Sequence, residues 1–280
     1  MKTLVAACFA TLTLLSTPAF AARQIIGSES DHSLAGEATD CEHFYKTTFT
    51  NLPSQMNDQE QREIQLAGVD QLRVIASEEG GVSIRGWNRP YARLIVCRYA
   101  FANTKSKAIR LLGSISVSHV KGEISAFGPP NDETQAWWVN MILYVPRRAT
   151  VDVRASNGGV AIRNMSGNVT AHATTGGISV AQSTGRYKIS TNSGGITLER
   201  VSGIVDASSR QGAIALKLAP DELPEVEARI ADGGEIFCQL HSCEAGLWGA
   251  NRSQLRLGHG VPQYRLNTTD APIMIGPVTF

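Results

Sequence analysis

Short segments in the middle of the chain alternate apolar and polar residues, and this pattern returns every 18 residues. Strict alternation is typical of a β-strand with one buried face. Each 18-residue unit holds two such segments, and matching positions of successive units carry apolar side chains. One set comprises Val160, Ile178, Ile196 and Ile214, and another comprises Val151, Val169, Tyr187 and Val205. The pattern therefore predicts two short strands in each unit, with their apolar side chains directed inward.

Glycine marks the boundaries of these strands. Seven glycines lie nine residues apart, at Gly158, Gly167, Gly176, Gly185, Gly194, Gly203 and Gly212. Glycine adopts positive φ without steric cost, so this spacing predicts a tight turn after each strand. One unit cannot bury its own inner face, whereas stacked units form a continuous core. The sequence therefore predicts an all-β fold, a single-stranded β-solenoid that resembles a β-helix and is built of 18-residue turns with two short strands each.

Looser copies of the pattern extend this prediction toward both ends of the chain. Residues 74–87 resemble residues 153–165, with one extra residue before the paired glycines, and further copies follow at 226–240 and 264–275. Residues 103–113 interrupt the strands with a capping residue, an apolar face and a final glycine, which predicts one short inserted helix. We expect three parts: a signal peptide at 1–21, an extended N-terminal segment at 22–68 and a β-solenoid adhesin domain at 69–280.

The first residues have the features of an export signal. Lys2 precedes an apolar run at residues 4–15, and Ala19 and Ala21 provide the small residues that a signal peptidase recognises. The run is too short to span a bilayer, and no later segment is long and apolar enough for a transmembrane helix. We expect cleavage after Ala21 and a protein that is periplasmic, on the cell surface or secreted.

Export gives the cysteines a specific meaning, because oxidising compartments favour disulfides. Four cysteines follow the signal peptide: Cys41, Cys97, Cys238 and Cys243. Four cysteines allow three pairings, and the sequence does not choose among them. Cys238 and Cys243 are close enough for a hairpin-type bridge, which would leave Cys41 and Cys97 for each other. The alternative is a metal site that adds His241, but its spacing does not match the usual paired zinc ligands.

The composition of the chain excludes several classes of protein. The chain has a formal net charge of +1, and removal of the signal peptide takes away one basic residue, Lys2, and leaves the mature chain neutral. This balance excludes a basic nucleic-acid binder. With 42% hydrophobic residues and only 18% charged residues, the chain is also neither a disordered tail nor a coiled coil.

The units that follow a Val-Pro corner resemble those of the bacterial putative-adhesin domain family of unknown function. The residues that carry the resemblance include Tyr144-Val145-Pro146, Asn157-Gly158-Gly159, Thr175-Gly176-Gly177 and Ser193-Gly194-Gly195. The resemblance covers about residues 70–278 and implies an exported or envelope protein of stacked β-solenoid turns. It implies an adhesive role and provides no catalytic residue.

No cluster of residues predicts a reaction or a cofactor. A calcium-binding nonapeptide roll needs an Asp at a repeated position that here holds Arg163, Ala181 and Glu199. His172 is most simply an exposed polar residue on a strand. Trp137-Trp138 should place one ring inward and one outward, where it either stacks on a sugar or packs against the inserted helix.

We therefore expect a non-enzymatic envelope or cell-surface scaffold with an adhesive or ligand-binding role. Its expected partner is a surface glycan or an envelope protein, and we expect no cofactor. The alternative is a β-helix carbohydrate-active enzyme, either a polysaccharide lyase or a hydrolase. The segments left for an active site are 101–138 and the loop 241–262, which contains His241, Trp248, Arg252 and His259.

Overall fold

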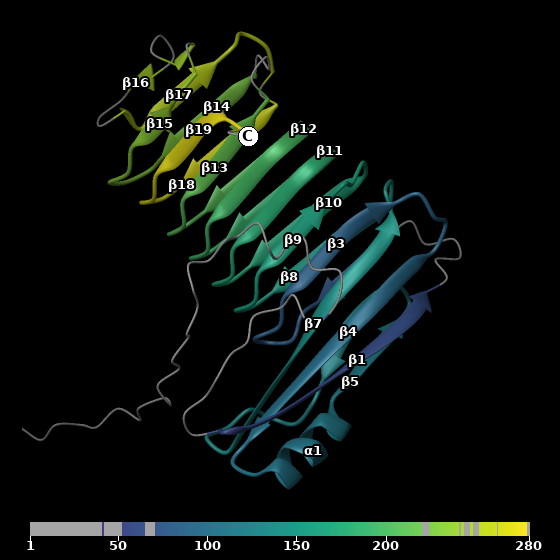
Figure 1. Ribbon diagram of the computed structural model, residues 1–280. Coiled ribbons are helices and arrows are strands. Elements are labelled where there is room, and N and C mark those ends of the chain that lie inside the picture. The colour runs from purple at the N-terminus through teal and green to yellow at the C-terminus, as the bar shows by residue number, and fades with distance from the viewer. Residues whose placement is uncertain are drawn as a thin grey trace, which may run out of the picture.

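The computed structural model describes residues 41, 52–64, 71–219, 224–240, 242–243, 247–248, 252–261 and 263–278. These residues form one mixed sheet of 19 strands and a single helix, α1. Figure 1 shows that the sheet curls into a half-barrel, with long curved strands next to a row of shorter ones. The all-β prediction with one inserted helix is confirmed for the described part of the chain.

In the middle of the chain the strands lie where alternation predicts them, but β11 and β12 each span two predicted strands, so the turns expected at Gly185 and Gly203 are not formed. The first half comprises β1 (Ser54–Ile64), β2 (Gln71–Ile75), β3 (Val82–Trp87), β4 (Ala92–Ala102), α1 (Lys105–Ser114), β5 (Ser116–Val120), β6 (Glu123–Phe127), β7 (Gln135–Pro146), β8 (Thr150–Ala155) and β9 (Val160–Arg163). The second half comprises β10 (Asn168–Ala173), β11 (Ile178–Thr191), β12 (Ile196–Ser209), β13 (Ile214–Leu218), β14 (Val226–Ile230), β15 (Ile236–Cys238), β16 (Leu247–Trp248), β17 (Gln254–Leu257), β18 (Tyr264–Thr268) and β19 (Ile273–Pro277).

Strands β8–β13 pair in parallel with an offset of 18 residues. Ile196 on β12 lies opposite Ile178 on β11 and Ile214 on β13. All three side chains are buried in the main core. Strands β11 and β12 each run on through a second row, where Tyr187 lies opposite Val205. The inward positions that the sequence predicted are therefore correct in this region.

The prediction of a single-stranded β-solenoid over residues 69–280 is nevertheless wrong. Strands β1, β4 and β7 pair antiparallel, as do β5 with β6 and β14 with β17. Strand order also departs from chain order, because β18 lies between β12 and β14 and β19 lies between β13 and β15. Alternation reveals that a strand has one buried face. It does not reveal which strand pairs with it or in which direction, and this is why the prediction failed.

The long strands carry a second hydrophobic cluster on the side of the sheet away from the main core. Trp138 on β7 stacks against Phe101 and Tyr99 on β4, with ring centroids 4.5 and 5.8 Å apart. Leu52, Ile95 and Ile142 complete the buried side of this cluster. The long antiparallel strands therefore separate two apolar layers.

Helix α1 covers one end of the long strands (Figure 1). The Thr104 side chain accepts a hydrogen bond from the Lys107 backbone N–H at 3.4 Å, which satisfies an N-terminal donor of the helix. Ala108 and Leu111 are its buried residues. This confirms the helix predicted at 103–113, which begins two residues later and ends one residue later than expected.

The expected signal peptide at 1–21 lies outside the described residues, as does most of the expected segment 22–68. Within the described ranges, no helix is both long and apolar enough to cross a membrane.

Candidate functional site

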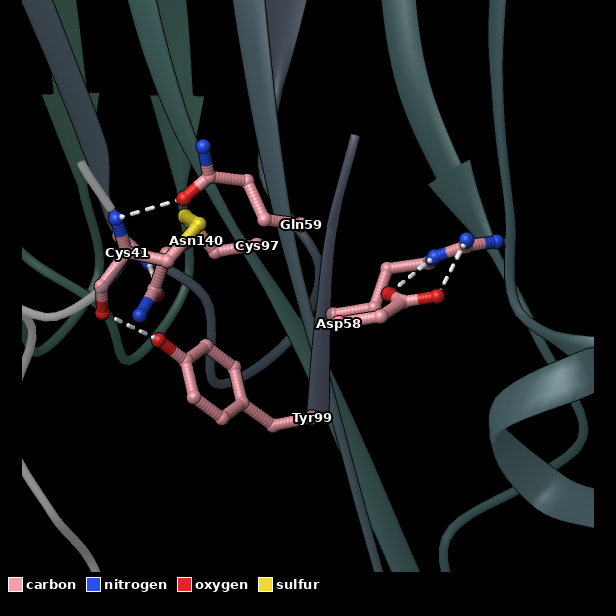
Figure 2. The surroundings of a disulfide bond; sticks show 8 residues. Cys41, Asp58, Gln59, Cys97, Tyr99 and Asn140 are labelled. Atoms are coloured by element: carbon pink, nitrogen blue, oxygen red, sulfur yellow. Dashed lines mark hydrogen bonds and ion pairs between the residues drawn. A yellow bond between two sulfur atoms is a disulfide. The ribbon is translucent and has the colours of Figure 1, made fainter. Parts of the chain in front are cut away.

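The first pair of predicted cysteines forms a disulfide that ties an N-terminal residue to the sheet. Cys41 joins Cys97 of β4, with the two Cα atoms 5.4 Å apart. Figure 2 shows the two further contacts of Cys41. The Tyr99 hydroxyl donates to its carbonyl oxygen at 2.8 Å, and its backbone N–H donates to Gln59 Oε1 at 3.3 Å. Three neighbouring residues therefore hold Cys41 in place.

The second pair, Cys238 and Cys243, forms a disulfide with Cα atoms 5.9 Å apart. The pairing is the one that the hairpin spacing favoured. Because the two sulfurs are bonded to each other, they are not thiolates for a metal ion. His241, the third member of the alternative metal site, lies outside the described residues.

The remaining polar candidates have structural partners. His172 Nδ1 and Ser190 Oγ share a hydrogen bond of 2.9 Å across neighbouring strands. Glu199, the one acidic residue at the calcium-roll position, lies 3.8 Å from the Lys217 ammonium. These contacts favour a structural role for both side chains.

Both tryptophans of the Trp137-Trp138 pair pack against hydrophobic clusters of the protein, one on each side of the sheet. Trp138 is buried in the second hydrophobic cluster. Trp137 is half-buried, packs against the main core and donates its ring N–H to the Pro129 carbonyl oxygen. The packing interpretation therefore describes this pair better than the sugar-stacking one.

The structure brings together a different set of residues, which we call the arginine groove. It is an open groove of about 710 Å³. Its lining includes Arg89, Arg147, Arg148 and Arg200, the hydroxyl residues Ser166, Thr184 and Ser202, and Trp87 and Gln182. Among the described residues that line it, none is Asp or Glu. The groove therefore gathers positive charge on a chain whose formal net charge is only +1.

Bends between the two rows of strands place these residues side by side, and for β11 and β12 the bend lies inside the strand. Trp87 at the end of β3 lies opposite Pro146 at the end of β7, so the segments that follow both strands meet there. In three successive 18-residue units, Asn164, Gln182 and Arg200 adopt φ of 58°, 49° and 50°. This left-handed conformation turns the chain at the same point each time. The hydroxyl residues follow two positions later and form a row along the groove.

Two buried tyrosines form hydrogen bonds with the backbone at this bend. The Tyr187 hydroxyl lies 3.4 Å from the Met165 carbonyl oxygen and 3.3 Å from that of Thr184, and the Tyr264 hydroxyl donates to the Val201 carbonyl oxygen at 2.6 Å. Burial raises the pKa of Tyr187 to about 12, against a smaller opposite effect of its hydrogen bond with Ser183. The Tyr187 hydroxyl therefore remains a protonated donor at neutral pH, and the hydrogen bonds of both tyrosines hold the backbone beneath the groove.

Two groups of the groove are held in a defined orientation. Arg147 Nε donates to the Asn164 carbonyl oxygen at 2.9 Å. The Trp87 ring N–H donates to the Tyr91 carbonyl oxygen at 2.8 Å. The Arg93 guanidinium lies 5.2 Å from the centre of the Trp87 ring, within the range of a cation–π contact. Such fixed groups lose little conformational entropy when a ligand binds.

A second open groove, of about 690 Å³, lies at the other turn of the 18-residue unit. Ser190, Ser208, Arg210, Arg229 and Asn267 contribute to its lining. Arg229 is paired with Glu227. This groove is polar, with less concentrated charge than the arginine groove.

Sequence reasoning missed the arginine groove. It left segments 101–138 and 241–262 for a site, and the groove lies in neither; His241 and the Trp248 side chain lie outside the described residues, and Arg252 and His259 are exposed. A signal was present, because Pro146-Arg147-Arg148 marks a corner with two adjacent positive charges. This signal indicates a site only once the pairing of the strands is known, because that pairing brings Arg89 and Arg200 close to Arg147 and Arg148.

Comparisons with known proteins find similar solved structures but no matching family model or curated protein. Similar solved structures include a putative cell adhesion protein from Clostridium sporogenes, at 10% identity and TM-score 0.39, covering 80% of this chain and 100% of that one. A putative adhesin from Bacteroides fragilis has 11% identity and TM-score 0.31, covering 79% of this chain and 97% of that one. The names of both structures refer to adhesion.

Proposed function

We propose that the protein is an exported, non-enzymatic binding protein of the cell envelope or cell surface. In this proposal the curled sheet is a rigid scaffold, and the arginine groove is its ligand-binding site. The observation that carries it is the groove itself, which collects four arginines and a row of hydroxyls where the strands bend between their two rows. Binding sites are usually concave and largely preformed, with a few polar groups that orient the ligand.

Two further features support export. The chain holds two disulfides, which persist in oxidising compartments. Its first residues have the features of a signal peptide with cleavage after Ala21. The proposed organisation is a signal peptide at 1–21, a segment at 22–68 anchored through Cys41, and a binding domain at 69–280.

The arrangement of groups favours binding over catalysis. Polysaccharide hydrolases need two carboxyl groups that face one bond, and lyases need a base beside the reacting carbon. The described residues that line the arginine groove supply guanidinium and hydroxyl groups instead. Arginine stays protonated at physiological pH, so it stabilises an anion but does not remove a proton.

The test is to measure retention of the purified mature chain, 22–280, on envelope fractions and on a glycan array. We expect saturable binding that falls when Arg147 and Arg148 are both changed to Glu. Lys105→Glu with Arg110→Glu on α1 is the matched control, since it changes charge equally at exposed positions far from the groove. Binding unaffected by the groove pair, or turnover of a polysaccharide by the purified chain, would overturn the proposal.

A further inference from the structure

We propose that the arginine groove binds an acidic polysaccharide, whose carboxylate or sulfate groups contact the arginines. The inference rests on the proposed function, because it takes the groove to be a binding site, and it adds the chemical class of the ligand.

The charge of the groove indicates an anion. Arg89, Arg147 and Arg148 are exposed and come from two segments about 60 residues apart in sequence, which the pairing of β3 with β7 brings together. A guanidinium binds carboxylate and sulfate oxygens through paired N–H groups, and such charge-assisted bonds are about twice as strong as neutral ones. Arg147 is already oriented by its bond to Asn164, so it meets a ligand with its remaining N–H groups in a fixed place.

The repeated hydroxyls indicate a polymer of sugars. Ser166, Thr184 and Ser202 occupy the same position in three successive units, and Thr184 lies directly opposite Ser202. Neighbouring strands are about 4.8 Å apart. This spacing is close to the length of one sugar residue in an extended polysaccharide. A polysaccharide therefore presents a hydroxyl to each of these positions in turn, whereas a single small anion reaches only one of them.

The surroundings of the groove argue against a membrane surface. Proteins that lie on anionic lipid combine basic residues with apolar side chains that enter the bilayer. Within the part of the chain that the structure describes, the exposed large apolar side chains include Phe127, Phe237, Val261 and Met274. None of the exposed large apolar side chains lines the arginine groove.

The test uses the mature chain and four acidic polysaccharides: polygalacturonate, alginate, hyaluronate and dextran sulfate. We expect at least one of them to bind, and we expect affinity to fall about tenfold when NaCl rises from about 50 to about 500 mM, because salt screens exposed charges. The first three carry carboxylates and the last carries sulfate, so the preferred probe identifies the anion. Uncharged dextran, poly-L-glutamate and anionic phosphatidylglycerol vesicles are the comparison ligands.

Variants test the site. Arg147→Gln with Arg148→Gln should weaken binding about tenfold, and Arg89→Gln should weaken it about threefold. Arg147→Lys with Arg148→Lys should restore part of the loss, because it restores the charge. Lys105→Gln with Arg110→Gln on α1 should leave affinity within about twofold, because the whole 11-residue length of β4 separates that helix from the groove. Circular dichroism melting curves establish that each variant is folded.

Three results would overturn the inference: no binding to any acidic polysaccharide, equal binding to poly-L-glutamate or vesicles, and binding that the Gln pair does not change. Equal binding to poly-L-glutamate indicates an acidic protein partner, and vesicle binding indicates a lipid surface. A chain that binds envelope fractions through the groove but ignores acidic polysaccharides refutes the ligand class and leaves the proposed function standing. If the native chain shows no saturable binding to envelope fractions or to any polysaccharide, both the ligand class and the proposed function are refuted.

Discussion

The position of a residue in the parallel ladders decides which substitutions it tolerates. Ile196 is buried between Ile178 and Ile214, whereas the next residue, Thr197, is half-buried on the opposite side of β12. Ile196→Asp places an unpaired charge in the core and should lower the free energy of unfolding by about 4 kcal/mol or prevent folding. Thr197→Asp should change it by less than about 1 kcal/mol. Urea denaturation measures both, and equal losses would contradict this placement of the two side chains.

Tyr187 gives the protein a defined response to alkali. Its pKa is raised to about 12 by burial, while an unfolded tyrosine titrates near 10. The folded state therefore holds its proton more tightly, so stability is complete below pH 10 and falls as pH rises from about 10 to about 12. The full effect is on the order of 2–3 kcal/mol.

The comparison with Tyr187→Phe isolates this contribution. The variant loses the hydroxyl contacts with Met165 and Thr184 and should be less stable by about 1 kcal/mol at pH 8. The variant has no proton to lose at this site. The difference in the free energy of unfolding between the native protein and the variant should therefore shrink as pH rises above 10. Urea titrations at pH 8, 10 and 11 test this, and a gap that stayed constant would show that Tyr187 is not shielded from solvent.

At the scale of elements, the paired glycines differ sharply in what they permit. A Cβ on Gly176 would collide with the backbone carbonyl of Gly158 in the neighbouring unit, while a Cβ on Gly159 would lie 3.5 Å from its nearest neighbour, the Gly177 carbonyl oxygen. Gly176→Ala should therefore push two turns apart and destabilise the protein by about 3 kcal/mol, with Gly159→Ala within about 1 kcal/mol of the native chain. Thermal melting of the two variants compares them directly, and similar melting temperatures would mean that the turns are not in this close contact.

The two disulfides join elements over very different lengths of chain. Cys41 and Cys97 are 56 residues apart, while Cys238 and Cys243 are 5 apart. In the loop-entropy account the first bridge contributes about 4 kcal/mol and the second about 2 kcal/mol. Replacing each pair by Ala and measuring urea unfolding should give losses in that order. A larger loss from the short loop would show that local packing, and not loop closure, dominates.

The elements show how far the sequence predicts this fold. Residues 74–87 were predicted to be a looser copy of residues 153–165, and the two segments do pair in matching register. Val74 lies opposite Val153, and Val82 lies opposite Val160. The extra residue in the first copy is absorbed before its glycine pair. Helix α1 was also predicted, because capping and apolar spacing are local signals. Local chemistry therefore determines the type and phase of α1 and of the strands in the repeated units.

At the scale of the whole molecule, local pattern no longer suffices. The antiparallel pairing of β1, β4 and β7 and the return of β18 between β12 and β14 depend on contacts between distant segments. The arginine groove depends on the same contacts, because Arg89, Arg147 and Arg200 meet only once strand order is set. Since a strand with one buried face accepts partners in either direction, the sequence predicts the strands of the repeated units but not the long antiparallel strands, the half-barrel or its groove.

The last prediction concerns maturation of the whole chain on export. Ala19 and Ala21 fit the small-residue positions of a signal peptidase site, so the mature N-terminus should be Ala22. All four remaining cysteines are paired in the structure, so the exported protein should contain no thiol that reacts with iodoacetamide after denaturation. The mature chain, 22–280, produced in a reducing cytoplasm should expose four reactive thiols and unfold at lower urea concentration, because it lacks both constraints on the unfolded state. N-terminal sequencing and mass spectrometry of alkylated protein provide both readouts. An exported chain that retained Met1, or that still alkylated at Cys97, would refute the proposed route through an oxidising compartment.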